Sequence, residues 1–330
     1  MIKQFSKALI ISLIIIFSFS CKQGKKSGFF VNTSSGGINE IIVVCNQTLW
    51  DGYVGDTLRH ILQCEAPMLP QPEPLFELIY IKPEKFTSNF QKHRNIIMLK
   101  TDNQYDTATF VAKKDIWARP QIIVNITAKN ESDLSKFLTI NNNKIVDFFE
   151  ETERNRLIAG YELNSDKVIR EKLLSKHKLM ITVPKGYSLD IDKDDFIWIS
   201  SEGPDLIQNI YIYYYDYTSP DIFTLNNLIK KRNEILKQVP GPDPGTYLTT
   251  ENLVTPSFRQ FKYQNKYFAE IRGLWKIEGY FMGGPFVSLS TIDEKRNRVV
   301  TVEAVLFAPK YNKRNYLTQM EAILYTIKFE

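Results

Sequence analysis

The segment FVSLSTIDEKRNRVVTVEAVLF, residues 286–307, decides the fold of the C-terminal half. It holds two runs that are rich in apolar and β-branched residues, separated by the polar group DEKRN at 293–297. Such runs on either side of a short polar connection predict a β-hairpin. We therefore expect strands at 286–292 and 298–307, joined by a turn.

The rest of residues 163–330 also contains strand and helix patterns. A helix capped by Ser165 and reaching Lys176 opens this half, because Ser is a favoured N-cap. The remaining patterns predict an antiparallel sheet with helices packed on one face. The predicted strands are 179–183, 196–200, 210–215, 258–263 and 267–275. The predicted helices are 225–238 and 315–325.

Residues 38–162 also mix strands and helices. No convincing pattern of long parallel crossovers is visible among them. The sequence therefore predicts an α+β fold class with two α+β domains, 38–162 and 163–330. The predicted strands are 40–45, 75–81, 95–99, 107–112 and 121–127, and the helices are those around 54–62, 83–92, 131–137 and 143–151.

Residues 1–20 have the pattern of a signal peptide. A basic start is followed by a 13-residue apolar stretch, 8–20, which spans only about 20 Å as a helix and falls short of a bilayer core. The next residue is Cys21, and the preceding SFS resembles the lipobox of bacterial lipoproteins. That resemblance implies cleavage before Cys21 and its lipidation with diacylglycerol and palmitate. The alternative is an ordinary signal peptide with Cys21 incidental.

Residues 21–37 predict a flexible tether, since they are rich in Lys, Ser and Gly. Three lysines beside the lipid add attraction to anionic headgroups. The membrane is therefore an expected partner. By resemblance to sorting signals, the absence of Asp after the cysteine favours the periplasmic face of the outer membrane.

The net charge of +5 lies in the leader and the tether. There are 42 basic and 37 acidic residues, and residues 1–26 hold five lysines and no acid. The remaining chain is neutral and offers no field that would attract nucleic acid. We expect no nucleic-acid partner.

Two cysteines remain besides Cys21. In an oxidising compartment Cys45 and Cys64 could form a disulfide. Alternatively, both are small buried apolar residues, since Cys45 ends the run IIVVC and Cys64 ends an amphipathic helix.

The sequence lacks a recognisable catalytic or metal site. Only His60, His93 and His177 are present, and none forms a zinc-binding pair. The acids at 190–195 lack the glycine and the glutamate of a calcium loop. We expect no metal and no cofactor.

Three arginines stand in distinctive strings and are candidate ligand-binding residues: Arg94, Arg119 and Arg272. A planar guanidinium suits carboxylate or phosphate. The alternative is a structural ion pair, with Glu73 or Glu270 as partner. Trp275 is a further candidate for binding. So are Gly283 and Gly284, because glycines in a loop permit close approach by the backbone of a partner.

A tyrosine-rich strand, 210–217, is a candidate glycan site. Alternation places Tyr213 and Tyr215 on one face, where they could stack on a sugar. They could also pack beneath a helix. Two proline-rich loops, 67–74 and 240–244, either frame a binding groove or serve as stiff connections.

Several strings resemble an uncharacterised lipoprotein family of Bacteroidota, domain of unknown function 4837. The resemblance covers nearly the whole chain, and implies a lipidated envelope protein without an established activity. The C-terminal half also faintly resembles the α/β/α sandwiches of PsbP and Mog1, which are binding or assembly modules. The strings are 50–55, 69–76, 94–97, 117–121, 272–275 and 282–286, and for the second resemblance 183–186.

These features favour a non-enzymatic binding or assembly module that faces the periplasm. Its expected partner is an envelope protein or a glycan. One alternative is an envelope hydrolase that uses a carboxylate pair, which leaves no recognisable string. A purely structural role is another.

Overall fold

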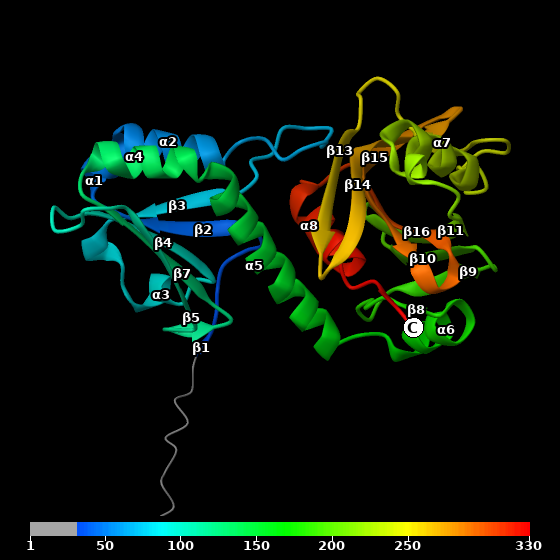
Figure 1. Ribbon diagram of the computed structural model, residues 1–330, viewed down its shortest axis with the longest axis horizontal. Coiled ribbons are helices and arrows are strands. Elements are labelled where there is room, and N and C mark those ends of the chain that lie inside the picture. The colour runs from blue at the N-terminus through cyan, green and yellow to red at the C-terminus, as the bar shows by residue number, and fades with distance from the viewer. Residues whose placement is uncertain (1–31) are drawn as a thin grey trace, which may run out of the picture. The chain divides into compact units, whose positions relative to one another are not determined.

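The computed structural model describes residues 32–330 (Figure 1). The predicted signal peptide, Cys21 and the tether up to residue 31 lie outside the described residues. Among residues 32–330, no helix is long and apolar enough to cross a membrane.

The N-terminal half carries a sheet with order β3-β2-β4-β7-β5. Its strands are β1 (Asn32–Thr33), β2 (Glu40–Val44), β3 (Glu77–Ile81), β4 (Asn95–Thr101), β5 (Thr109–Lys114), β6 (Ala118–Arg119) and β7 (Ile122–Ala128), where β1 and β6 form a separate pair. Its helices are α1 (Gln47–Asp51), α2 (Tyr53–Leu62), η1 (Pro83–Lys85), α3 (Ser88–Gln91), α4 (Glu131–Ile140) and α5 (Asn142–Leu163).

This sheet is largely parallel, although the sequence shows no convincing pattern of long parallel crossovers. Strands β3, β2, β4 and β7 run parallel, and only β5 is antiparallel. The apolar runs of the central strands are buried on both faces, as parallel strands require. On one face α2, α4 and α5 cover the sheet, while Phe86 and Trp117 pack on the other.

The C-terminal half carries an antiparallel sheet with order β12-β14-β15-β16-β11-β10-β9, and β13 also pairs with β14. Its strands are β8 (Leu179–Met180), β9 (Ser188–Asp192), β10 (Phe196–Glu202), β11 (Ile207–Asp216), β12 (Tyr247–Thr250), β13 (Ser257–Tyr263), β14 (Lys266–Glu278), β15 (Tyr280–Asp293), β16 (Arg298–Phe307) and β17 (Lys328–Phe329). Its helices are α6 (Lys167–His177), η2 (Pro220–Phe223), α7 (Leu225–Leu236), η3 (Glu294–Arg296) and α8 (Arg314–Leu324).

The α+β class and the antiparallel C-terminal sheet are confirmed. The predicted hairpin is present as β15 and β16, with Asp293 paired to Arg298. The helices, however, pack on both faces rather than on one. Helices α6 and α8 cover one face and α7 covers the other, so most of β15 and all but the end of β16 are buried on both sides.

Two local predictions also differ from the structure. Asp166, rather than Ser165, caps α6, because its carboxylate accepts a hydrogen bond from the backbone N–H of Ile169 at 3.0 Å. The end of the predicted tether, residues 32–37, is held against the N-terminal half. There β1 pairs with β6, and Ser35 forms a bridge with His93.

The proline-rich loop before β3 is fixed to α8. The Glu73 carboxylate accepts hydrogen bonds from the backbone N–H groups of Lys313 and Arg314, at 2.5 and 3.0 Å. A carboxylate in this position satisfies N–H groups that a helix leaves without partners in its first turn. Glu73 therefore joins a loop of the N-terminal half to a helix of the C-terminal half.

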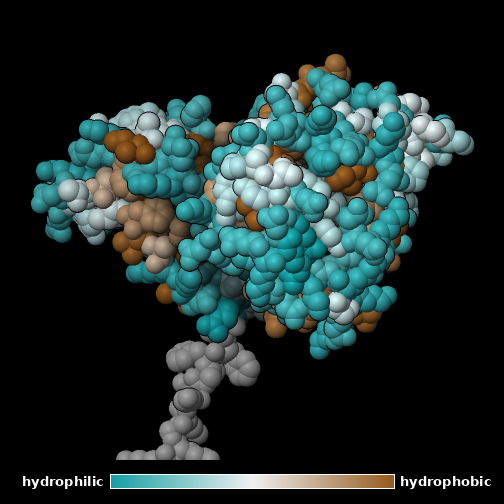
Figure 2. Space-filling view, turned by 45° about the vertical axis from the view of Figure 1, so that its right-hand side comes forward, coloured by the Kyte–Doolittle hydropathy of each residue, from teal (hydrophilic) through white to brown (hydrophobic). Residues whose placement is uncertain are grey.

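The surface is mainly hydrophilic, with separate apolar patches (Figure 2). Among large apolar side chains, Phe281, Leu253 and Leu163 are 105%, 90% and 92% exposed. They lie on three different segments of the chain. Single exposed apolar residues of this kind are normal and indicate no docking surface.

Candidate functional site

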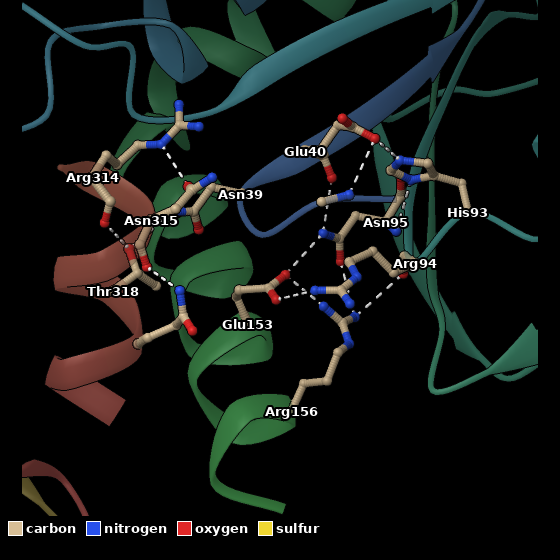
Figure 3. Close-up of polar contacts among 12 residues, drawn as sticks. Asn39, Glu40, His93, Arg94, Asn95, Glu153, Arg156, Arg314, Asn315 and Thr318 are labelled. Atoms are coloured by element: carbon tan, nitrogen blue, oxygen red, sulfur yellow. Dashed lines mark hydrogen bonds and ion pairs between the residues drawn. The ribbon is translucent and has the colours of Figure 1, made fainter. Parts of the chain in front are cut away.

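Arg94 belongs to a buried polar network rather than to an open site (Figure 3). Its guanidinium donates to the Glu153 carboxylate at 2.7 Å, and Arg156 donates to the same carboxylate at 2.6 Å. Asn95 contributes a further hydrogen bond at 3.2 Å. Glu153 is only 1% exposed, so its carboxylate is cut off from water. The three donors replace the lost hydration, and the two arginines balance the negative charge.

The network lies at the amino ends of β2 and β4, where Glu40 contacts His93 at 2.6 Å. Asn39 extends it to α8 through a hydrogen bond to Thr318 at 2.9 Å. Ligands of open parallel sheets bind at the carboxyl ends of the strands. The position and the complete pairing of Glu153 therefore indicate a structural role.

The other predicted residues are also occupied by contacts within the chain. Arg119 is an exposed residue that pairs with Asp115 at 2.9 Å. Trp275 is buried and donates its indole N–H to the carbonyl of Leu306 at 3.1 Å. Arg94, Arg119 and Trp275 do not line one surface.

The two glycines permit close approach, but by neighbouring strands. A Cβ added at Gly283 would lie 2.6 Å from the carbonyl oxygen of Trp275. One added at Gly284 would lie 2.2 Å from that of Leu306. Both positions serve the packing of the sheet.

The tyrosine strand packs beneath α7. Tyr213 is 2% exposed, and its hydroxyl donates to Glu303 at 3.3 Å. Tyr215 is half-buried, and burial raises its pKa to about 12. The ammonium of Lys231 lies 5.5 Å from the centre of the Tyr215 ring. These tyrosines form no open ladder for a sugar.

Both described cysteines are free thiols, so the disulfide is not formed in this structure. Cys45 directly follows β2 in the chain and is buried, and burial raises the pKa of its thiol to about 12. Cys64 is exposed and its thiol contacts the carbonyl of Ile61 at 3.3 Å. Within residues 32–330, no three His, Cys, Asp or Glu side chains are grouped to hold a metal.

Arg272 is the predicted residue that does lie at a cavity. Its guanidinium donates to Glu270 at 2.8 Å and also contacts Glu321 of α8. Arg259 of β13 binds the same Glu270 carboxylate through two nitrogens, at 2.7 and 2.9 Å. Burial alone would raise the pKa of Glu270, but the two arginines lower it to about 2.

This cluster borders a groove. Strand β13 forms one wall of the groove and α5 forms the other, and we call this groove the α5–β13 groove. A recess of about 530 Å³ and a smaller one of about 210 Å³ lie along β13, and both reach Glu150. A third cavity, of about 50 Å³, continues from Glu150 to Arg272 and Arg314. The groove is lined by Pro67, Glu150, Arg154, Phe261, Tyr263, Tyr325 and the Arg259–Glu270–Arg272 cluster.

Two groove residues retain unused binding capacity. Within the described residues, neither Glu150 nor Arg154 has an ion pair, although they lie one turn apart on α5. The guanidinium of Arg154 lies 4.0 Å from the centre of the Tyr325 ring. Its Nε is buried and lacks a hydrogen-bond partner. Burial, with a smaller contribution from Glu321, raises the pKa of Glu150.

The groove can therefore hold a polar ligand. The Arg154 fork is suited to a carboxylate, and its stacking on Tyr325 fixes its plane. The Glu150 carboxyl, which has no hydrogen-bond partner among the described residues, can hydrogen-bond a polar group of a ligand. The Arg259–Glu270–Arg272–Glu321 cluster is internally neutralised and positions β13 and β14 against α8.

Sequence reasoning found Arg272 and its partner Glu270 but missed Glu150, Arg154, Arg259 and Tyr325. The predicted helix 143–151 stopped within the first half of α5, so Arg154 was not placed on it. Besides Arg272, the signal in the sequence that points to the groove is the proline-rich loop, since Pro67 lines it. Glu73 of the same loop caps α8 and pairs with no arginine candidate.

His177 and the acids near it form another internal cluster. His177 is buried between Asp192 at 2.7 Å and the hydroxyl of Tyr214 at 2.9 Å. Lys176 also contacts Asp192, at 3.0 Å. These contacts join α6 to β9 and β11.

Two family models match the chain. A domain of unknown function, DUF4837, matches residues 166–326, and a second, DUF8532, matches residues 34–162. The resemblance to DUF4837 is thus supported for the C-terminal half, whereas the N-terminal strings fall in the other model. No curated protein matches the chain.

Proposed function

We propose that the protein is a lipid-anchored binding module of the cell envelope, and that the α5–β13 groove binds a segment of a partner protein. The observation that carries this proposal is Arg154, a cation stacked on Tyr325 at an open recess without an acidic partner among the described residues. A fixed, unpaired guanidinium costs desolvation that a ligand carboxylate would offset.

The anchor rests on the sequence. A basic start, a short apolar stretch and Cys21 support cleavage and lipidation, with the body in the periplasm at the outer membrane. Mass spectrometry of the mature N-terminus is expected to find a diacylglycerol on Cys21. Release of the Cys21→Ala chain from membranes would agree, whereas unchanged membrane attachment would contradict the proposed anchor.

A binding role accounts for the groove better than a hydrolase does. Glu150 and Glu321 line one cavity, and Glu321 helps to raise the pKa of Glu150, as a neighbouring acid in a catalytic pair would. The cavity that both line, however, is only about 50 Å³, which holds water but not a sugar ring. Glu321 is also engaged by Arg272.

Co-purification from detergent-solubilised envelopes tests the binding role. We compare the lipidated chain with Arg154→Gln and with Arg170→Gln, an exposed arginine on α6. The proposal predicts a stoichiometric protein partner that is retained by Arg170→Gln and reduced about tenfold by Arg154→Gln, since one charge-assisted contact is removed. Equal recovery with both variants would show that the groove is not the binding site.

A further inference from the structure

Strand β13 is an edge strand with one side unpaired. It pairs with β14 through a hairpin whose two loop residues, Gln264 and Asn265, have φ of 48° and 63°. A two-residue loop of this type makes Tyr263 and Lys266 a hydrogen-bonded pair. Because such pairs alternate in antiparallel ladders, the backbone groups of Phe258, Gln260 and Lys262 are directed away from β14.

These outward groups have no partner in the described chain. Within residues 32–330, no hydrogen bond reaches the backbone N–H or carbonyl of Phe258, Gln260 or Lys262. The edge faces the α5–β13 groove, whose recesses of about 530 and 210 Å³ are lined by residues of β13 and α5. One more strand needs about 4.8 Å of lateral space.

Charge selects among the strands that could occupy this edge. The sequence of β13, SFRQFKY, contains no acid, and its Arg259 is already neutralised by Glu270. The opposite wall of the groove carries Arg154 together with Asp147, Glu150 and Glu151, so the occupant needs one carboxylate at Arg154 and no further acids beside α5. The same edge of a second copy would bring like charges together. The far edge of the sheet, β9, is acidic, but His177 and Lys176 already engage its Asp192.

We propose that an extended segment of the partner protein adds to β13 as a new edge strand, with a single carboxylate on Arg154. This inference rests on the proposed function and specifies its ligand. The outward backbone groups of β13 supply the ladder. Because side chains alternate along a strand, the carboxylate points into the groove and its neighbours point away from it.

The probe is a fluorescein-labelled synthetic peptide of nine residues that alternates threonine and valine, with glutamate at its centre. Its binding to the mature chain is followed by fluorescence polarisation. Lys262→Pro removes one outward N–H and leaves the ladder to β14 intact, because that N–H does not point toward β14. Lys262→Ala is the matched control, since it removes the same side chain and keeps the N–H.

We expect Lys262→Pro to weaken binding about tenfold and Lys262→Ala to change it less than about twofold. A peptide methylated on alternate backbone nitrogens should not bind the unmodified protein, which makes this measurement independent of how any variant folds. Replacing the central glutamate with glutamine should weaken binding to the native chain but not further in Arg154→Gln.

Equal binding by the two Lys262 variants, equal binding of the methylated peptide, or no binding of the acidic probe would each overturn strand addition. So would pairing of β13 with a second copy of the chain. If partner co-purification depends on Arg154 but is unaffected by Lys262→Pro, strand addition is wrong and the proposed function stands. If co-purification is independent of Arg154, the proposed function itself fails.

Discussion

At the scale of single residues, the contrast between Glu150 and Glu153 is the most informative. Both lie on α5, three residues apart. Glu153 is neutralised by Arg94 and Arg156, whereas Glu150 has no ion-pair partner among the described residues. One acid therefore serves the structure, and the other has hydrogen-bonding capacity that the described residues do not use.

The raised pKa of Glu150 predicts the effect of Glu150→Gln on stability. A carboxyl whose pKa is above 4.5 in the folded state loses stabilising free energy as pH rises from 4.5 through the folded pKa. Glutamine does not ionise. The variant should thus match the native chain near pH 4 and exceed its free energy of unfolding near pH 8, measured by urea denaturation.

Glu151→Gln is the control, because Glu151 is exposed on the same helix. Its free energy of unfolding, measured at the same two pH values, gives the effect of removing one exposed charge from α5. A Glu150→Gln variant that is less stable than the native chain at pH 8 would mean that the ionised carboxylate is stabilising.

Residue roles were only partly predictable from the sequence. An ion pair with Glu73 or Glu270 is the structural alternative that the sequence offers for the three arginines, and the structure pairs Glu270 with Arg272. From the sequence, Tyr213 is either a ligand contact or a core residue, and Trp275 is a ligand contact; both side chains are buried in the structure. Sequence alone does not show on which face of a strand a helix packs. Tyr213 is a core residue because α7 packs on its face of β11.

At the scale of elements, α7 is held on its sheet by a buried ion pair. The Arg232 guanidinium donates to Glu303 of β16 at 2.6 Å and to the hydroxyl of Thr250 on β12 at 2.8 Å. Arg232 and Glu303 are 1% and 0% exposed. The guanidinium also lies 3.9 Å from the centre of the Phe286 ring.

Arg232→Ala should lower the free energy of unfolding by about 3–5 kcal/mol, because it leaves the Glu303 carboxylate buried without its partner. The double variant Arg232→Met/Glu303→Leu should recover most of the loss, since neither charge remains. Lys231→Ala breaks a surface pair with Glu234 and removes the contact with the Tyr215 ring, and should cost less than about 2 kcal/mol. Similar losses for Arg232→Ala and Lys231→Ala would refute the role of the pair.

Element types were more predictable than their arrangement. The hairpin of β15 and β16 follows from its polar turn, and α2 follows from Val54, Leu58 and Leu62 on one face. The parallel order of β2, β3 and β4 was not foreseen. Short apolar runs indicate burial on both faces but do not give strand direction.

At the scale of the whole molecule, the groove is built from segments that are distant in the sequence. Pro67 lies in a loop of the N-terminal half, Arg154 on α5, Arg259 on β13 and Tyr325 directly after α8. Glu73 fixes the loop to α8. No local pattern encodes such a meeting, so the site could not be assembled from the sequence.

The central claim is that the α5–β13 groove binds a partner segment. It is tested most directly by a photo-cross-linking amino acid placed at Glu151, an exposed residue that lines the groove. The control position is Glu171, exposed on α6. In membranes that contain the lipidated chain, we predict one protein adduct from position 151, none from position 171, and about tenfold less adduct in Arg154→Gln. The same adduct from both positions, or an adduct that is insensitive to Arg154→Gln, would contradict the claim.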